Sequence, residues 1–257
     1  MTADPTLPAQ RTQLILDELR HQGRVVAADL ARRYAVSEDS IRRDLRELAG
    51  QGLCQRVYGG AVLPAPKPAP LRERLTQDRG DKAELAARVV ALLQPGQVLL
   101  IDAGSTNQAI AQQLPGALAL TVITNAPQIA TAAAWQAGTR VHLIGGRLAD
   151  GGGAVGAEAL AQVQRLRADV YLPGACAVDA DTGVWAMDGE EATLKRAMLA
   201  CASRVIVAAT TEKLGARGVW QVAALDEIDD LVLTTSAPAA LAERFRAAGI
   251  AVHPTHS

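Results

Sequence analysis

The sequence predicts an α/β protein in two parts, a small helical domain and then a larger, mostly parallel α/β domain. The chain before residue 63 contains three helix-like segments. The later chain alternates short apolar runs with segments rich in Ala and Leu, which is typical of a parallel sheet covered on both faces. LPAPKPAP at 63–70 favours an extended spacer, because alternating prolines cannot join a helix or central strand. We predict domains at 1–63 and 81–257, joined by a linker at 64–80.

Two helices are expected at the beginning of the first domain. The first spans 9–22 and should end at Gly23, because glycine readily adopts the left-handed conformation that stops many helices. The second is a short helix within 27–36, and Ala35 and Val36 should form a brief turn after it. Apolar spacing directs five side chains toward the core: Leu14, Ile15, Leu19, Leu30 and Tyr34.

A third helix should begin after Ser37, a good N-cap residue. Ile41, Leu45 and Leu48 follow at i, i+4 and i+7, so they form one buried stripe and leave the arginines outside. A short helix, a tight turn and a second helix with polar first turns is the helix-turn-helix layout, whose second helix enters the major groove of DNA. A solvated helix with internal ion pairs would give the same local pattern.

Residues 53–62 indicate two short strands around Gly59 and Gly60, a hairpin in the position of a wing. Arginine suits DNA contacts because its planar fork bonds phosphate or the edge of guanine bidentately. Asp39 can accept from a cytosine amino group or favour the helix dipole, and we prefer the second role. The residues expected at DNA are Ser37, Asp39, Ser40, Arg42, Arg43, Arg46, Arg56 and Tyr58.

Two stretches together carry a family resemblance. VSEDSIRRDLREL at 36–48 and RVYGGA at 56–61 resemble the amino-terminal domain of the DeoR family of bacterial transcriptional regulators. The resemblance implies a winged helix-turn-helix domain that binds double-stranded operator DNA.

Six apolar, β-branched runs predict the strands of the second domain, and a helical stretch at 71–93 should lead into them. Small or polar residues follow each run. Polar groups at the carboxyl ends of parallel strands are where open α/β sheets bind ligands. The runs lie at 97–101, 119–124, 140–145, 169–172, 204–210 and 230–235.

DAGST at 102–106 follows the first run and opens a helix. Gly104 permits a tight turn, and Ser105 and Thr106 place hydroxyls beside free N–H groups, where a phosphate is readily held. Many strand-to-helix turns share this pattern without binding a ligand, so the ligand-site prediction also depends on the residues that follow the next two strands. The ends of those strands carry Thr124, Asn125, Gly145 and Gly146.

The full set resembles the DeoR-type sensor domain, a Rossmann-like fold grouped with ribose-5-phosphate isomerase and CoA transferases. The resemblance implies a phosphorylated sugar or related metabolite as effector. Gly104, Ser105 and Thr106 would hold the phosphate, and Asp102 and Asn125 would bond sugar hydroxyls. The implied effector residues are Asp102, Gly104, Ser105, Thr106, Thr124, Asn125, Gly145, Glu191, Lys195 and Lys213.

Two segments depart from the family pattern, so the sugar is left open. ATTEKLG at 209–215 lacks the aspartate that usually precedes the lysine, and LPGACAVD at 172–179 differs at Pro173 and Cys176. DADTG at 179–183 lacks the glycine and glutamate positions of an EF-hand loop and is expected to be a plain turn.

Some proposed site residues also have structural interpretations. Lys195 and Arg196 can form surface pairs with the glutamates one turn earlier, and Asp102 can cap the turn that follows it.

Composition narrows the class of protein further. The net charge of −1 gives no whole-chain evidence for a nucleic-acid partner. Cys54, Cys176 and Cys201 have no CxxC spacing and no histidine cluster, which argues against a disulfide framework or a zinc site. No metal or cofactor is expected. The amino terminus lacks a signal-peptide pattern and no apolar run is long enough for a membrane helix, so we expect a cytoplasmic protein.

The preferred function is a repressor that binds operator DNA as a symmetric dimer or tetramer and is released by a sugar phosphate. The alternative is an enzyme, either a sugar-phosphate isomerase or an acyl-CoA transferase, with Glu191 or Asp102 as base. An isomerase has no use for a winged helix-turn-helix, so no catalytic residue is assigned. An activator or constitutive binder also fits the sequence.

Overall fold

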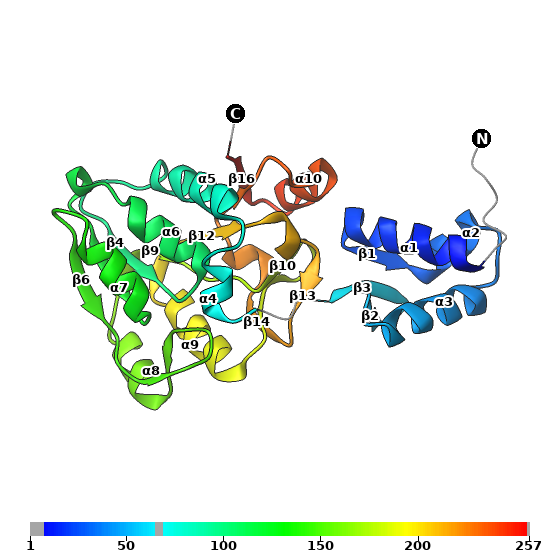
Figure 1. Cartoon of the computed structure of the whole chain (residues 1–257), viewed down its shortest axis with the longest axis horizontal. Helices are drawn as coiled ribbons and strands as arrows, with labels where there is room; N and C mark the ends of the chain where they lie inside the picture. The colour runs from blue at the N-terminus through cyan, green and yellow to red at the C-terminus, as the bar shows by residue number, and fades with distance from the viewer. Residues whose placement is uncertain (1–7, 65–68, 256–257) are drawn as a thin grey trace.

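The computed structural model describes residues 8–64 and 69–255 of the 257-residue chain. It places a small amino-terminal body beside a larger carboxy-terminal one (Figure 1). Residues 65–68 of the predicted linker, and the chain ends at 1–7 and 256–257, lie outside the described residues.

The amino-terminal body has the element order of a winged helix-turn-helix. Ile15, Leu19, Leu30, Ile41 and Leu45 meet in its core, which confirms most of the predicted inward faces. The elements are α1 (Pro8–Gln22), β1 (Arg24–Val26), α2 (Ala27–Arg33), α3 (Glu38–Gly50), β2 (Gln55–Val57) and β3 (Gly60–Pro64).

Two details of this body differ from the sequence prediction. Leu14 is 44% exposed, whereas Leu16 is 7% exposed and takes the inward position. Strand β1 was not predicted, because three residues give too short a pattern. It forms because buried Val25 pairs with Ala61 of β3, a partner distant in the chain.

The carboxy-terminal body is built on a seven-stranded parallel sheet, as the alternating pattern predicts. The six predicted runs all supply strands, and the carboxy-terminal strand β16 was missed. In spatial order the strands are β16 (Ala251–Pro254), β15 (Asp230–Leu233), β12 (Ala202–Ala209), β9 (Ala168–Leu172), β4 (Val98–Ile101), β5 (Thr121–Thr124) and β6 (Arg140–Leu143).

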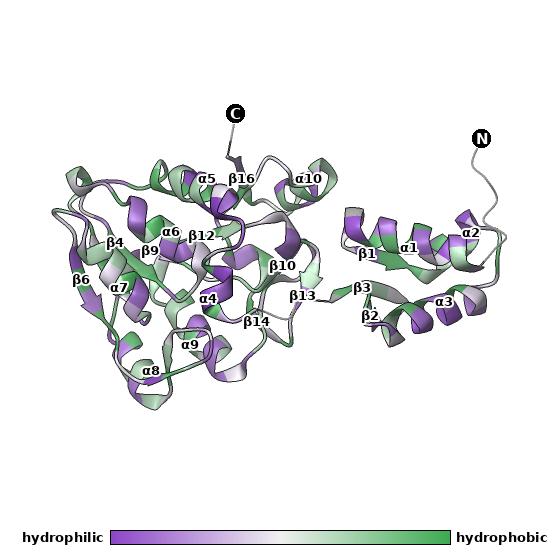
Figure 2. Ribbon diagram, viewed as in Figure 1, coloured by the Kyte–Doolittle hydropathy of each residue, from purple (hydrophilic) through white to green (hydrophobic). Residues whose placement is uncertain are grey.

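Helices cover both faces of this sheet, and apolar residues of the strands fill the two intervening cores (Figure 2). One face carries α5 (Arg79–Val90), α6 (Ser105–Gln113) and α7 (Pro127–Ala134). The other carries α8 (Ala157–Val163), α9 (Gly189–Leu199) and α10 (Ala239–Ala247).

Several short elements decorate the sheet and were not predicted. They are the pair β7 (Arg147–Leu148) and β8 (Ala154–Val155), the sheet of β10 (Ala177–Asp179), β11 (Gly183–Ala186) and β14 (Trp220–Ala223), strand β13 (Ala216–Arg217), and the 3-10 turns η1 (Gly116–Leu118), η2 (Thr211–Lys213) and η3 (Leu225–Glu227). Among the described residues, no helix is both long and apolar enough to cross a membrane.

The single helix predicted over 71–93 is broken into α4 (Leu71–Arg74) and α5. Asp78 takes a left-handed conformation with φ of 47°, which ends the regular path. Lys82 stabilises the break, because its buried ammonium donates to the carbonyls of Arg74 and Gln77 at 2.6 and 2.7 Å. We call residues 69–82 the strap.

Candidate functional site

Helix α3 presents a polar face outward because its apolar stripe is packed inward. Ile41, Leu45 and Leu48 are buried against α1 and α2. Ser37 caps the helix, since its hydroxyl accepts from the backbone N–H of Ser40 at 3.2 Å. The outward face is hydrophilic along its length (Figure 2).

The Ser37 cap gives a first prediction. Ser37→Ala should lower the free energy of unfolding by about 1 kcal/mol, because one N–H at the helix start loses its partner. Urea denaturation measures the change. Ser203→Ala, at an exposed position of β12, is the control and should stay within about 0.5 kcal/mol of the parent. Equal denaturation midpoints for the two variants would show that the cap contributes nothing.

Six of the seven charged residues of α3 divide into three groups. Asp44 is buried and forms an ion pair with Arg11 of α1, at 2.5 and 3.0 Å, which fixes α3 against α1. Arg42 pairs with Glu38 and Asp39 on its own helix. Arg43 and Arg46 are exposed and, within the described part of the chain, make no ion pair.

The wing extends the same surface. Arg56 is exposed on β2, and the Tyr58 side chain at the tip of the β2–β3 turn is fully exposed. The structure therefore brings Arg43, Arg46, Arg56 and Tyr58 to the surface, and holds Arg42 partly neutralised.

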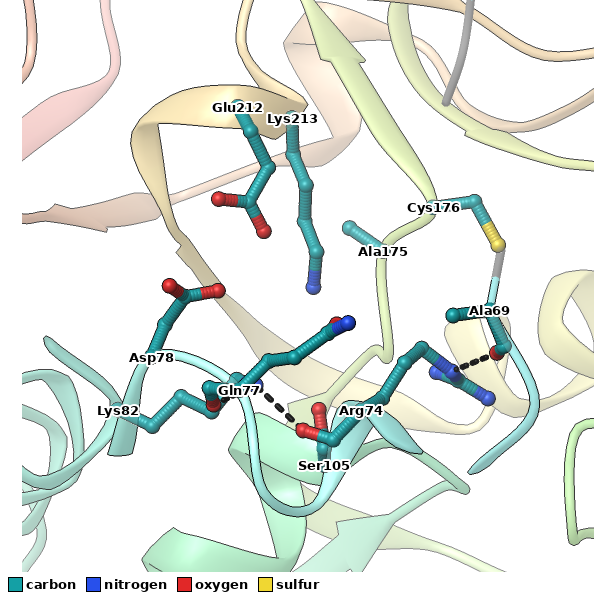
Figure 3. Close-up of a pocket in the computed structure, with 10 residues that line it drawn as sticks. All are labelled: Ala69, Arg74, Gln77, Asp78, Lys82, Ser105, Ala175, Cys176, Glu212 and Lys213. Carbon is teal, nitrogen blue, oxygen red and sulfur yellow. Dashed lines mark hydrogen bonds between the residues drawn. The ribbon is translucent and has the colours of Figure 1, made fainter. Parts of the chain in front are cut away.

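A second candidate site lies between the strap and the carboxyl end of the parallel sheet. Two adjoining cavities of about 360 and 540 Å³ share Ala69, Arg74, Ala175 and Cys176. We call the first the cationic cavity; its lining side chains include Arg74, Gln77, Asp78, Lys82, Ser105, Glu212 and Lys213 (Figure 3). We call the second the acidic cavity; its lining side chains include Asp150, Asp188, Glu191 and Lys195.

The cationic cavity gathers basic groups from opposite sides. Arg74 comes from the strap, and Lys213 points toward it from η2 (Figure 3). Burial lowers the pKa of Lys213 and of Lys82, because each ammonium loses water. Ser105 lies at the first position of α6, where backbone N–H groups are free and the helix dipole is positive.

A buried ion pair lies beside the acidic cavity, which Lys195 lines. Lys195 Nζ donates to Asp102 Oδ2 at 2.5 Å and to the carbonyl of Gly174 at 2.9 Å. Asp102 also accepts from the Tyr171 hydroxyl at 2.8 Å and from the Gly174 N–H. The surface-pair interpretation of Lys195 is therefore not what the structure shows, because the side chain turns inward.

Burial and the charges around this ion pair shift the pKa values of three side chains. Burial is the largest single influence on the pKa of Lys195 and lowers it, but the charge and hydrogen bond of Asp102, together with Cys176 and Glu191, raise it by more, so the net direction is upward. Burial raises the pKa of Tyr171 well above its ordinary value, and the carboxylate adds to the effect. Burial also raises the pKa of half-buried Glu191, with Lys195 opposing. Lys195 is accordingly held as a cation.

The sequence-predicted effector residues are only partly brought together. Ser105, Glu191, Lys195 and Lys213 line the two cavities. Asp102 and Asn125 line a narrow space that shares Glu191 and Lys195 with the acidic cavity. The others lie elsewhere: Gly104 precedes α6, Thr106 and Thr124 are buried, and Gly145 is exposed beside Gln162.

Two of the buried polar residues have structural partners. Thr124 Oγ1 accepts from the N–H of Ala126 at 3.1 Å, and Asn125 Nδ2 donates to the carbonyl of Ala154 at 2.9 Å. Asn125 Oδ1 and Thr106 Oγ1 have no hydrogen-bond partner among the described residues. Asn125 thus retains an acceptor at the edge of the site.

Sequence reasoning missed the contribution of the strap. Arg74, Gln77, Asp78 and Lys82 were assigned to a linker or a leading helix, yet they close the cationic cavity. One signal was present, since Lys82 stands on the same helical stripe as Leu85, Ala86 and Val89. A lysine in an apolar stripe needs a specific partner.

Comparison with known proteins identifies both halves of the chain. Residues 11–67 match the family model described as "DeoR-like helix-turn-helix domain", and residues 77–235 match "DeoR C terminal sensor domain". The chain is 32% identical to the HTH-type transcriptional regulator GlpR of Haloferax volcanii, over 96% of this chain and 97% of that protein. It is 30% identical to the glycerol-3-phosphate regulon repressor of Escherichia coli, over 89% and 91%.

Solved structures give more distant matches. Ribose 5-phosphate isomerase A of Methanocaldococcus jannaschii is 17% identical with a TM-score of 0.38, over 52% of this chain and 53% of that one. The eIF2B beta subunit of Chaetomium thermophilum is 14% identical with a TM-score of 0.41, over 95% and 73%.

Proposed function

The chain belongs to the DeoR family of transcriptional regulators, and we propose that it represses a sugar or polyol catabolic operon and leaves its operator when a phosphorylated sugar or polyol binds. One observation carries the proposal. Arg74 and Lys213 converge with Ser105, at the start of α6, around one cavity. Two cations beside a helix N-terminus favour a phosphate group.

The phosphate end of the effector is assigned to the cationic cavity. Burial removes water from the Lys213 ammonium and so lowers its pKa. A phosphate dianion would supply the opposite charge that stabilises the protonated ammonium there. Arg74 is tethered to the carbonyl of Ala69 through Nε, which leaves its other guanidinium nitrogens available to the cavity. The relative named for glycerol-3-phosphate agrees with a small phosphorylated compound as effector.

The hydroxyl-bearing end is assigned to the acidic cavity. Asp150 and Glu191 provide acceptors there, and Asn125 offers an unused carbonyl oxygen nearby. Carboxylates and amides bond sugar hydroxyls without requiring a charge on the ligand. We propose that Asp102 and Lys195 hold the neighbouring acceptor side chains in position. Their ion pair would stay intact when the effector binds.

The DNA-binding surface is assigned to α3 and the wing. Arg43 and Arg46 would read bases or grip phosphates in the major groove, and Arg56 and Tyr58 would contact the flanking backbone. We propose a homo-oligomer, because paired half-sites raise affinity through effective concentration. In this proposal residues 1–63 bind DNA, residues 64–80 form the linker and residues 81–257 bind the effector, and the strap overlaps the linker and the effector-binding domain. The protein would act in the cytoplasm.

The enzyme alternative receives little support from the site. Of its two candidate bases, Asp102 is held by Lys195 and Tyr171, so its carboxylate is already engaged. Turnover of ribose 5-phosphate by the purified protein would revive this alternative.

A thermal-shift screen tests the effector assignment. Because a ligand that binds only the native state raises the melting temperature, one phosphorylated sugar or polyol should do so while its unphosphorylated counterpart does not. Lys213→Gln should abolish the rise, measured against that variant's own unliganded value. Arg72→Gln is the matched control, since Arg72 lies on α4 but does not line the cavities. A rise that survives Lys213→Gln would contradict the assignment.

The same compound should weaken operator binding about tenfold or more, within the usual range of allosteric coupling. Fluorescence anisotropy with labelled operator DNA measures this change. An unchanged affinity at saturating effector would remove the regulatory part of the proposal.

A further inference from the structure

The wall of the cationic cavity continues directly into the sheet of the DNA-binding body. Lys213 is the last residue of η2, and β13 follows shortly after it. β13 pairs in parallel with the end of β3, with Ala216 opposite Leu63 and Arg217 opposite Pro64. One sheet of strands β1, β2, β3 and β13 therefore spans both bodies, as Figure 1 shows.

Two glycines bring the backbones of the two bodies into contact beside this ladder. Gly23 follows α1 and Gly215 precedes β13, with φ values of 76° and 73°. A Cβ atom on Gly215 would lie 2.5 Å from the Cα of Gly23, closer than any side chain tolerates. Within the amino-terminal body, the carbonyl of Gly23 accepts from the N–H of Leu63 at 3.1 Å. The two backbones therefore leave no room for a side chain at Gly23 or Gly215.

An ionic cluster surrounds the same contact. Asp181 pairs with Arg24 of β1 at 2.6 Å and with Arg244 of α10 at 2.7 Å. Arg217 of β13 lies 3.1 Å from Asp179 and 3.6 Å from Asp181. The aspartates come from the 179–183 turn, whose carboxylates are thus occupied by arginines. Half-exposed pairs add little stability, but opposite charges on two bodies fix their orientation.

We propose that this junction, formed by the β3–β13 ladder, the Gly23–Gly215 contact and Asp181, couples occupancy of the cationic cavity to the position of the DNA-binding body. The inference rests on the proposed function of that cavity. An anion that draws Lys213 inward displaces η2, and β13 must follow. A shifted β13 loses register with β3 and moves α3 and the wing relative to the sensor body.

The segment between the cavity and the ladder is short and anchored. Leu214 is buried, and the N–H of Gly215 donates to the carbonyl of Val178 at 2.8 Å. Only Leu214 and Gly215 separate Lys213 from β13, so the chain has little length in which to absorb a displacement of Lys213. The effector needs only to bind the cavity more tightly in one arrangement of the junction than in the other, because a difference in affinity between two states is what shifts their equilibrium.

Hydrogen–deuterium exchange on the full chain, with and without inorganic phosphate at millimolar concentration, tests the coupling. We expect phosphate to accelerate exchange of the amides in peptides covering 60–64 and 214–217 about tenfold. Lys213→Gln should remove this response. Strand β5 serves as the internal control. It lies three strands away from β12, the strand that precedes η2, and its exchange should not change.

Asp181→Ala tests the junction from the other side. It should speed exchange at 60–64 about tenfold without phosphate and leave the phosphate-induced rise in melting temperature in place. Asp226→Ala, an exposed acid in η3, is the matched control and should do neither.

The outcomes separate the two proposals. A phosphate-induced rise in melting temperature with unchanged exchange at 60–64 and 214–217 would overturn the coupling and leave the effector site standing. No rise in melting temperature with phosphate would overturn both. Normal exchange at 60–64 in Asp181→Ala would exclude the ionic cluster from the coupling device.

Discussion

Asp102→Ala is expected to lower the free energy of unfolding by about 3–5 kcal/mol, because it leaves the Lys195 ammonium buried without its carboxylate. Tyr171 and the Gly174 N–H lose an acceptor in the same step. Urea denaturation followed by circular dichroism measures the change. This is the largest stability effect that we predict for the sensor body.

Two comparison variants separate the ion pair from general damage. Asp150→Ala removes an exposed carboxylate at the mouth of the acidic cavity and should change stability by less than about 0.5 kcal/mol. Asp102→Asn combined with Lys195→Met removes both charges and should recover much of the loss. A loss in Asp102→Ala no larger than that in Asp150→Ala would mean that the pair does not support the fold.

Arg43→Ala and Arg46→Ala are expected to weaken operator binding by about 1–3 kcal/mol each if the side chain reads a base, with relaxed preference at one operator position. A side chain that contacts only phosphate should instead weaken all sequences equally and lower the salt slope by about one. Anisotropy titrations of operator and mismatched DNA over a salt series distinguish these results.

Arg42→Ala on the same helix is the matched control. Arg42 is already paired with Glu38 and Asp39, so its removal should cost less than that of either neighbouring arginine. All three side chains are exposed, and none of the substitutions should alter the melting temperature. A large loss from Arg42→Ala with none from Arg43→Ala would mean that another face of α3 meets DNA.

The main elements of the fold follow from local sequence patterns. Apolar runs such as 98–101 and 121–124 give central strands because both faces of a parallel sheet are buried. Strand β1 and the β10–β11–β14 sheet carry no such signal. Their three or four residues become strands only through partners elsewhere in the chain, as when Val25 meets Ala61.

The candidate sites were predictable to different degrees. The exposure of Arg43 and Arg46 follows from helical periodicity around Ile41 and Leu45, so it could be derived locally. The pairing of Asp102 with Lys195 joins residues on separate strand–helix units, and no local pattern encodes it. Arg74 reaches the cavity because the helical stretch predicted over 71–93 is broken after α4, and the local sequence pattern did not predict that break.

The shared sheet also bears on modular engineering. DNA-binding and sensor halves of regulators are often treated as interchangeable parts, yet here the final residues of β3 obtain a strand partner from the other half. A fragment that stops at Pro64 would expose that unsatisfied edge to association with other chains. A functional chimera would need a donor sensor that supplies a matching β13 and a glycine at position 215.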